Sequence, residues 1–101
     1  MFFITCFSRI ETDDKGWLNM GAVRTFGFEE TFEAAEESLN TNRCDMFEYL
    51  YTYALVEEMN PGIHPEVENR WFYKWDDERG GFFRMDEEPK EFANYCNIAL
   101  G

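Results

Sequence analysis

The sequence predicts an α+β fold in which two or three short helices pack on a small antiparallel sheet of four to five strands. Three observations lead to this class. Apolar residues make up 45% of the chain and aromatic residues 19%, which is the composition of a protein with a core. Short strand-like and helix-like segments are separated by turn-forming residues, without any repeat or low-complexity tract. The length of 101 residues fits one compact domain, residues 1–101.

The first two strands are predicted near the N-terminus. Residues 2–10 alternate between two faces, as the two-residue period of a strand requires. Both faces carry aromatic side chains, so we expect this strand in the centre of the sheet. The turn signal at residues 13–16 leads through a polar stretch into a second strand over residues 22–28, and we expect the two strands to form a hairpin.

Two helices are predicted next. Thr31 has the position of an N-cap for a helix with an apolar stripe over residues 32–39 and an end at residues 40–42. The capping-box spacing of Asp45 and Glu48 predicts a second, short helix over the residues that follow, up to Leu50.

Further strands are predicted in the second half of the chain. Residues 51–56 are rich in β-forming side chains, although a helix running on to residue 59 is an alternative. The clearest hairpin covers residues 70–85, with its turn at residues 76–81. Pro89 suits the first turn of a C-terminal helix, which would pack on the sheet.

The chain is strongly acidic. It has 21 Asp and Glu residues against 9 Lys and Arg residues, a formal net charge of −12. This charge argues against direct binding to nucleic acid or to an anionic membrane and favours a basic protein partner. Solubility alone also explains such a charge. The oligomeric state stays open, a homodimer included.

Cysteine usage and the N-terminus predict the compartment. Cys6, Cys44 and Cys96 are odd in number and contain no CxxC pair, so the sequence indicates neither a disulfide framework nor a zinc site. Residues 2–7 lack the features of a signal peptide, and no apolar run is long enough to span a membrane. We expect a cytoplasmic protein.

No catalytic residue is indicated. His64 is the single histidine and has no nucleophile near it in sequence, and no glycine-rich nucleotide motif occurs. The acidic run at residues 76–78 lacks the spacing of a calcium loop and predicts a solvated turn. We therefore expect no enzyme, no metal ion and no cofactor.

Five carboxylates are candidates for binding a partner because they crowd into nine residues, and several share one side of the predicted helix. A dense row of carboxylates imitates the phosphates of a nucleic acid and is attracted to a basic groove. A solvated helix face is the alternative interpretation. The five are Glu29, Glu30, Glu33, Glu36 and Glu37.

A second candidate site is aromatic. Trp71, Tyr73 and Trp75 share one face of a predicted strand, where they could stack a nucleotide base or anchor a partner. Arg24 could clamp the phosphate of such a ligand. Burial of the aromatic side chains in the core, and an internal ion pair for Arg24, are the alternative interpretations.

Five segments carry a resemblance that spans nearly the whole chain. They are Phe2-Phe3-Ile4-Thr5-Cys6-Phe7, Arg24-Thr25-Phe26-Gly27, Tyr53-Ala54-Leu55-Val56-Glu57-Glu58, Trp71-Phe72-Tyr73-Lys74-Trp75 and Ile98-Ala99-Leu100-Gly101. In these segments the chain resembles short, uncharacterised acidic proteins encoded by prophages and mobile elements of Gram-positive bacteria.

The resemblance implies a setting and carries over no catalytic residue. Small accessory proteins of phages often inhibit host defence, by blocking a protein such as a CRISPR nuclease or by sequestering a nucleotide signal. We therefore expect a non-enzymatic inhibitor that docks its acidic face on a basic surface of a host protein. A sponge for a nucleotide-like molecule and a virion or assembly component are the alternatives.

Overall fold

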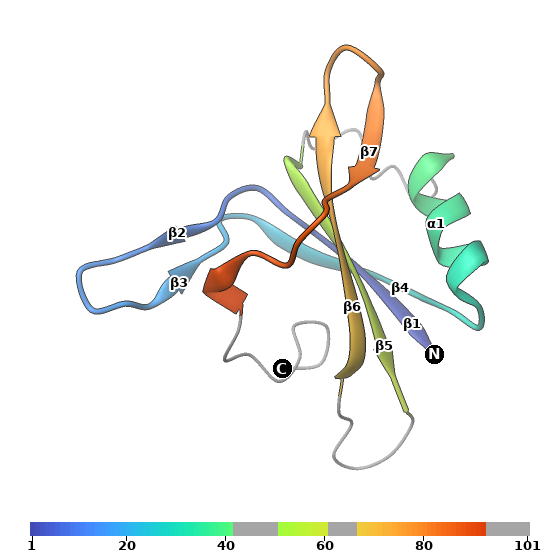
Figure 1. Cartoon of the computed structure of the whole chain (residues 1–101), viewed down its shortest axis with the longest axis horizontal. Helices are drawn as coiled ribbons and strands as arrows, with labels where there is room; N and C mark the ends of the chain where they lie inside the picture. The colour runs from blue at the N-terminus through green and yellow to red at the C-terminus, as the bar shows by residue number, and fades with distance from the viewer. Residues whose placement is uncertain (42–50, 61–66, 93–101) are drawn as a thin grey trace.

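The computed structural model describes residues 1–41, 51–60 and 67–92. These residues form a five-stranded antiparallel sheet in the order β4-β1-β5-β6-β7 and a two-stranded ribbon, β2-β3 (Figure 1). The strands are β1 (Phe2–Phe7), β2 (Glu11–Thr12), β3 (Leu18–Asn19), β4 (Val23–Glu29), β5 (Tyr53–Met59), β6 (Val67–Asp76) and β7 (Gly81–Arg84). The α+β class and the antiparallel sheet are confirmed.

The number of helices is lower than predicted. The described residues contain one α-helix, α1 (Phe32–Asn40), and one turn of 3₁₀ helix, η2 (Lys90–Phe92), where two or three helices were expected. Pro89 begins the 3₁₀ turn, because its carbonyl accepts from the Phe92 N–H at 3.0 Å with the short spacing of that helix type. The predicted helix near Asp45, most of the C-terminal helix, Cys44, His64 and Cys96 lie outside the described residues.

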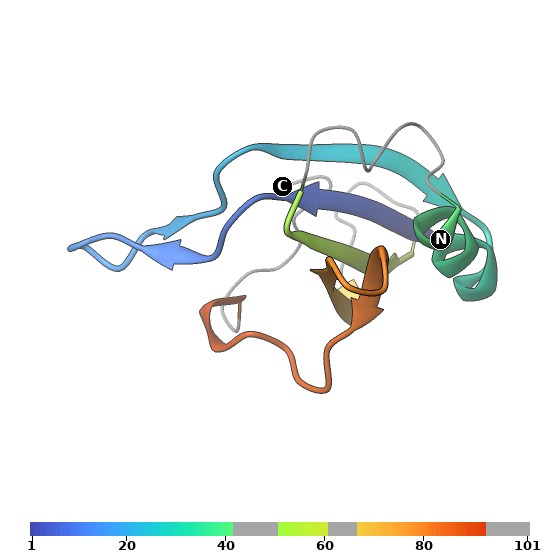
Figure 2. The same cartoon turned by 90° about the horizontal axis from the view of Figure 1, so that it is seen from above.

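The N-terminal hairpin forms as predicted and is longer than expected. β1 lies between β4 and β5 and pairs with both, so it is central. The polar stretch after it continues the hairpin as the ribbon β2-β3, whose turn is closed by the Asp13 carboxylate accepting from the backbone N–H groups of Lys15 and Trp17, both at 2.9 Å. The ribbon projects from the sheet on the side remote from α1 (Figures 1 and 2).

The segment that could have been a helix is the strand β5. It pairs along its length with β1 and with β6, so it is an interior strand. Residues 54–57 and Met59 are buried. α1 covers one face of β5 and η2 covers the other, so the strand is buried on both faces. Apolar side chains are therefore needed on each face.

α1 covers one face of the sheet (Figure 1). The Thr31 side chain caps it by accepting from the Ala34 N–H at 3.1 Å, as predicted. Ala35 and Leu39 are buried against a cluster that includes Ile4, Cys6 and Val56 of the sheet. The apolar stripe of the helix therefore forms the first half of the core.

The opposite face carries a second, aromatic half of the core. Phe92 of η2 is fully buried beside Phe7 and Phe72, with ring centroids 5.6 and 4.8 Å away. Leu55 completes this cluster, and Leu18 of the ribbon packs against its margin. The sheet is therefore the middle layer between α1 and η2.

Candidate functional site

The structure divides the five candidate carboxylates into two groups. Glu36 turns inward, where its carboxylate accepts from the Tyr73 hydroxyl at 2.7 Å and pairs with the Arg84 guanidinium at 3.2 Å. Glu29 is half-buried and accepts from the Ser38 hydroxyl at 3.3 Å. These two carboxylates hold α1 and the sheet together.

The other three candidate carboxylates face solvent. Glu30, Glu33 and Glu37 are exposed, and no ion pair joins them to any residue in the described part of the chain. Glu33 and Glu37 are one helical turn apart, so their carboxylates project on the same side of α1. Glu30 was expected on that side of the helix too, but it precedes the Thr31 cap and lies outside α1. The exposed part of the predicted acidic surface is therefore this set of three, which we call the α1 acidic surface.

The three aromatic candidates pack against the core under α1. Tyr73 is 3% exposed, and its hydroxyl is occupied by Glu36. The Trp71 ring lies 4.5 Å from the Phe32 ring of α1. Trp75 is half-buried, packs edge-on against Phe82, and donates its indole N–H to Asp77 at 2.6 Å.

Arg24 is not brought to these aromatic side chains. It is exposed, and its guanidinium lies 4.6 Å from the ring centroid of Phe26. Arg24 and Tyr73 do share a row across the sheet, but Cys6 of β1 and Ala54 of β5 lie between them. Three inter-strand spacings separate their backbones by about 14 Å. The four predicted ligand-binding residues therefore do not form one pocket.

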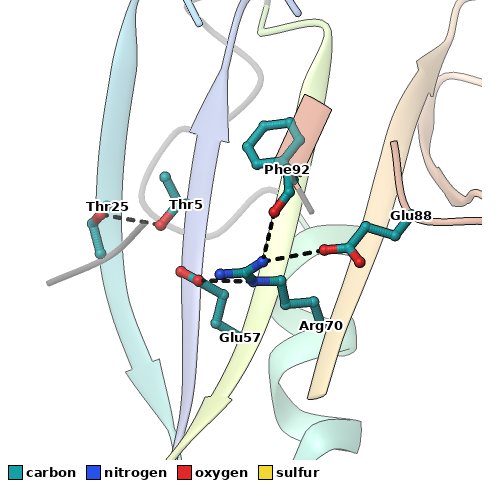
Figure 3. Close-up of polar contacts among 6 residues, drawn as sticks. All are labelled: Thr5, Thr25, Glu57, Arg70, Glu88 and Phe92. Carbon is teal, nitrogen blue, oxygen red and sulfur yellow. Dashed lines mark hydrogen bonds and ion pairs between the residues drawn. The ribbon is translucent and has the colours of Figure 1, made fainter. Parts of the chain in front are cut away.

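A buried polar cluster on the η2 face was not predicted (Figure 3). The Glu57 side chain is fully buried and lies 3.5 Å from the Nε atom of Arg70, whose side chain is 10% exposed. The Nη1 atom of Arg70 also donates to the Glu88 carboxylate and to the Phe92 carbonyl, both at 3.2 Å. Arg70 thus connects β5, β6 and the segment leading into η2, and we call this group the Arg70 cluster.

Two threonines lie beside the Arg70 cluster on the same face. The hydroxyl oxygens of Thr5 and Thr25 are 3.0 Å apart and share a hydrogen bond between β1 and β4 (Figure 3). Their bond satisfies two polar groups next to the apolar cluster. The side chains of the Arg70 cluster and of the threonine pair bond to other residues of the fold. We therefore interpret both groups as structural.

The sequence contained one usable signal for the Arg70 cluster. Glu57 interrupts a run of apolar residues, and Arg70 interrupts the next strand. The cross-strand register places these two residues directly opposite each other. That register depends on the length of the intervening connection and on the bulge after Glu58, which the sequence pattern does not show.

Burial raises the pKa of the Cys6 thiol from 9.0 to about 12, so this thiol stays protonated at neutral pH. Over residues 1–41, 51–60 and 67–92, His, Cys, Asp and Glu side chains form no group of three that could hold a metal ion. No helix in the same residues is long and apolar enough to cross a membrane.

No protein-family model matches the sequence, and neither the curated proteins nor the solved structures contain a match.

Proposed function

We propose that this protein is a non-enzymatic binding protein that docks the α1 acidic surface on a basic surface of a protein partner. One observation carries the proposal. Glu30, Glu33 and Glu37 remain exposed and outside any ion pair of the described residues, whereas Glu29 and Glu36 of the same segment are used inside the fold. Three carboxylates that the fold does not use are available to a partner.

The electrostatics of the whole chain favour the same partner. A net charge of −12 attracts a basic protein over long range and accelerates the encounter. Surfaces that bind nucleic acid are basic because they neutralise phosphates, so a set of neighbouring exposed carboxylates can occupy them. The resemblance to phage-encoded acidic proteins suggests a host defence protein as this partner and inhibition as the outcome.

The experiment is a pull-down from bacterial lysate with three forms of the protein as bait. The wild type is compared with E30Q/E33Q/E37Q, which neutralises the α1 acidic surface. The control is D14N/D86N/E87Q, which removes three charges from exposed carboxylates elsewhere that form no ion pair with the described residues. Both variants raise the net charge by three, so any difference between them reports the position of the charges.

The proposal predicts a basic, nucleic-acid-binding protein that the wild type and the control capture at low salt and that the α1 variant loses. High salt should weaken the capture because exposed charges are screened. Equal capture by the two variants, or the absence of such a protein from the wild-type sample, would contradict the proposal.

A further inference from the structure

A cleft of about 520 Å³ lies at the end of the β6–β7 hairpin. It is lined by residues 74–79 of β6 and the turn and by residues 83–85 of β7 and its end. Pockets for small ligands have volumes of about 300 to 1,000 Å³. The cleft therefore has room for a ligand of the size of a mononucleotide.

The charge of the cleft differs from that of the whole protein. Its lining contains three basic side chains, those of Lys74, Arg79 and Arg84, and three acidic ones, those of residues 76–78. The formal charges of the lining therefore sum to zero in a protein with a net charge of −12, and one of the three cations, Arg84, is paired with Glu36 of α1. An anion meets less repulsion here than at a surface with the average charge of the chain.

Two of the three acidic side chains of the cleft are engaged within the hairpin, whereas the exposed Glu78 carboxylate forms no ion pair with the described residues. Asp76 accepts from the Arg79 Nε–H at 2.8 Å and from two backbone N–H groups of the turn, and these bonds lower the pKa of its carboxyl. Asp77 accepts the indole N–H of Trp75. Lys74 is exposed and forms no ion pair with the described residues, so its ammonium group is available to an anion.

The guanidinium group of Arg79 stacks on the ring of Phe83. Its Cζ atom is 3.5 Å from the ring centroid, which is van der Waals contact, and its side chain is 60% exposed. The bond from Nε to Asp76 fixes the guanidinium, while the two Nη groups have no hydrogen bond to the described residues. Lys74 lies opposite Phe83 in the strand register, so both cations flank the same ring.

We propose that this cleft binds a nucleoside monophosphate. The base stacks on the exposed side of the Arg79 guanidinium, as bases do on arginine planes, and the phosphate binds Lys74 and the Nη groups of Arg79. A single phosphate suits the site, because each further phosphate adds repulsion from the acidic chain. The site shares no residue with the α1 acidic surface, so the two proposals stand or fall separately.

The test is an NMR titration of the ¹⁵N-labelled protein with adenosine monophosphate. We expect saturable shifts at millimolar concentration for the Trp75 indole N–H and for the amides of Lys74, Arg79 and Phe83. Adenosine and inorganic phosphate, titrated separately, should each bind about tenfold more weakly, because each lacks one of the two contacts. Equal binding of inorganic phosphate, or no saturable shift with the nucleotide, would overturn the proposal.

Three variants locate the site. Lys74→Ala should weaken nucleotide binding about tenfold through loss of a charge-assisted bond. Arg79→Lys keeps the charge, loses the planar stacking surface and should weaken binding of the nucleotide more than that of phosphate. Lys15→Ala removes the same charge from the ribbon turn and should bind like the wild type. The spectrum of each free variant verifies its fold, and unchanged affinity in both cleft variants would contradict the assignment.

Discussion

At the scale of single residues, the most informative contact joins Tyr73, Glu36 and Arg84. Tyr73 is buried in the sheet, and its hydroxyl donates to the one acidic side chain of α1 that turns inward. Burial raises the pKa of this hydroxyl, and the Glu36 carboxylate raises it further. The side chain therefore acts as a neutral hydrogen-bond donor that ties the helix to β6.

Removing this hydroxyl should destabilise the fold. Tyr73→Phe should lower the free energy of unfolding by about 1 kcal/mol, the value of a typical net hydrogen bond. Urea unfolding measures the change. Tyr53→Phe is the control, since Tyr53 stacks on Phe7 and its hydroxyl has no bond to the described residues. An equal effect of the two substitutions would show that the bond to Glu36 contributes nothing.

The Cys6 thiol predicts a dependence of stability on alkaline pH. Its pKa is about 12 in the folded protein and 9.0 when it is free, so the unfolded state loses the proton first. The stability that the protonated Cys6 thiol contributes is therefore fully present below pH 9 and is lost as pH rises toward 12. The loss from this group should be about 1.4 kcal/mol at pH 10.

Comparison of the wild type with Cys6→Ala isolates the contribution of the Cys6 thiol to this pH dependence. Urea unfolding at pH 8 and at pH 10 should show a larger loss of stability for the wild type than for the variant. Other titrating groups, Tyr73 included, are present in both proteins and cancel in the difference. The same pH-dependent loss in both proteins would show that Cys6 is accessible to water in the folded state.

At the scale of elements, the Arg70 cluster joins β5, β6 and the segment that carries η2. Glu57 is fully buried, and Arg70 is a cation beside it. A buried ion pair adds little net stability, but the loss of one partner leaves a charge in a medium that solvates it poorly. The position of the segment that carries η2 therefore depends on the Arg70 side chain.

Arg70→Met tests this sensitivity. It should lower the free energy of unfolding by about 3 to 5 kcal/mol, the range for breaking a buried pair. Glu88→Gln removes the partly exposed partner, which is 43% accessible, and should cost less than about 1 kcal/mol. Thermal or urea unfolding of both variants provides the measurement. A loss for Arg70→Met no larger than that for Glu88→Gln would contradict a role for burial.

The cap of α1 predicts a smaller effect. Thr31→Ala should lower the free energy of unfolding by about 1 kcal/mol, because the Ala34 N–H loses its acceptor. Thr31→Asp keeps an acceptor and adds favourable charge at the helix N-terminus, so it should retain wild-type stability. Equal unfolding midpoints for the two variants would show that the cap does not stabilise α1.

Local patterns predicted the elements that depend on neighbouring residues. The alternation in β1 and β6 and the Thr31 cap each follow from a few adjacent side chains. β5 was ambiguous, because a strand buried on both faces has no alternation of apolar and polar residues. The ribbon β2-β3 was missed because its strands have two residues each, too few to show a period.

The candidate site was harder to predict, because its contacts join residues far apart in sequence. Glu36 lies 37 residues from Tyr73, and only the packing of α1 on β6 shows that this carboxylate points inward. Arg24 and Tyr73 fall in one row of the sheet, but the strand order places two strands between them. The sequence pattern identified candidate residues and did not show which of them meet.

At the scale of the whole molecule, two surfaces with different chemistry flank the sheet. The α1 acidic surface is a set of exposed carboxylates, and the cleft at the end of the β6–β7 hairpin is neutral and contains a stacked arginine. The first suits a basic protein and the second a small planar anion. Both proposals involve binding at exposed groups that the packing of the core leaves available.

The most direct test of the acidic-surface proposal is the association rate constant with the basic partner isolated by the pull-down. It is measured at low and high salt for the wild type, E30Q/E33Q/E37Q and D14N/D86N/E87Q. We predict that the α1 variant associates much more slowly than the control at low salt and that the difference shrinks at high salt, as screening requires. Equal rates for the two variants at low salt would contradict the proposal that α1 presents the binding surface.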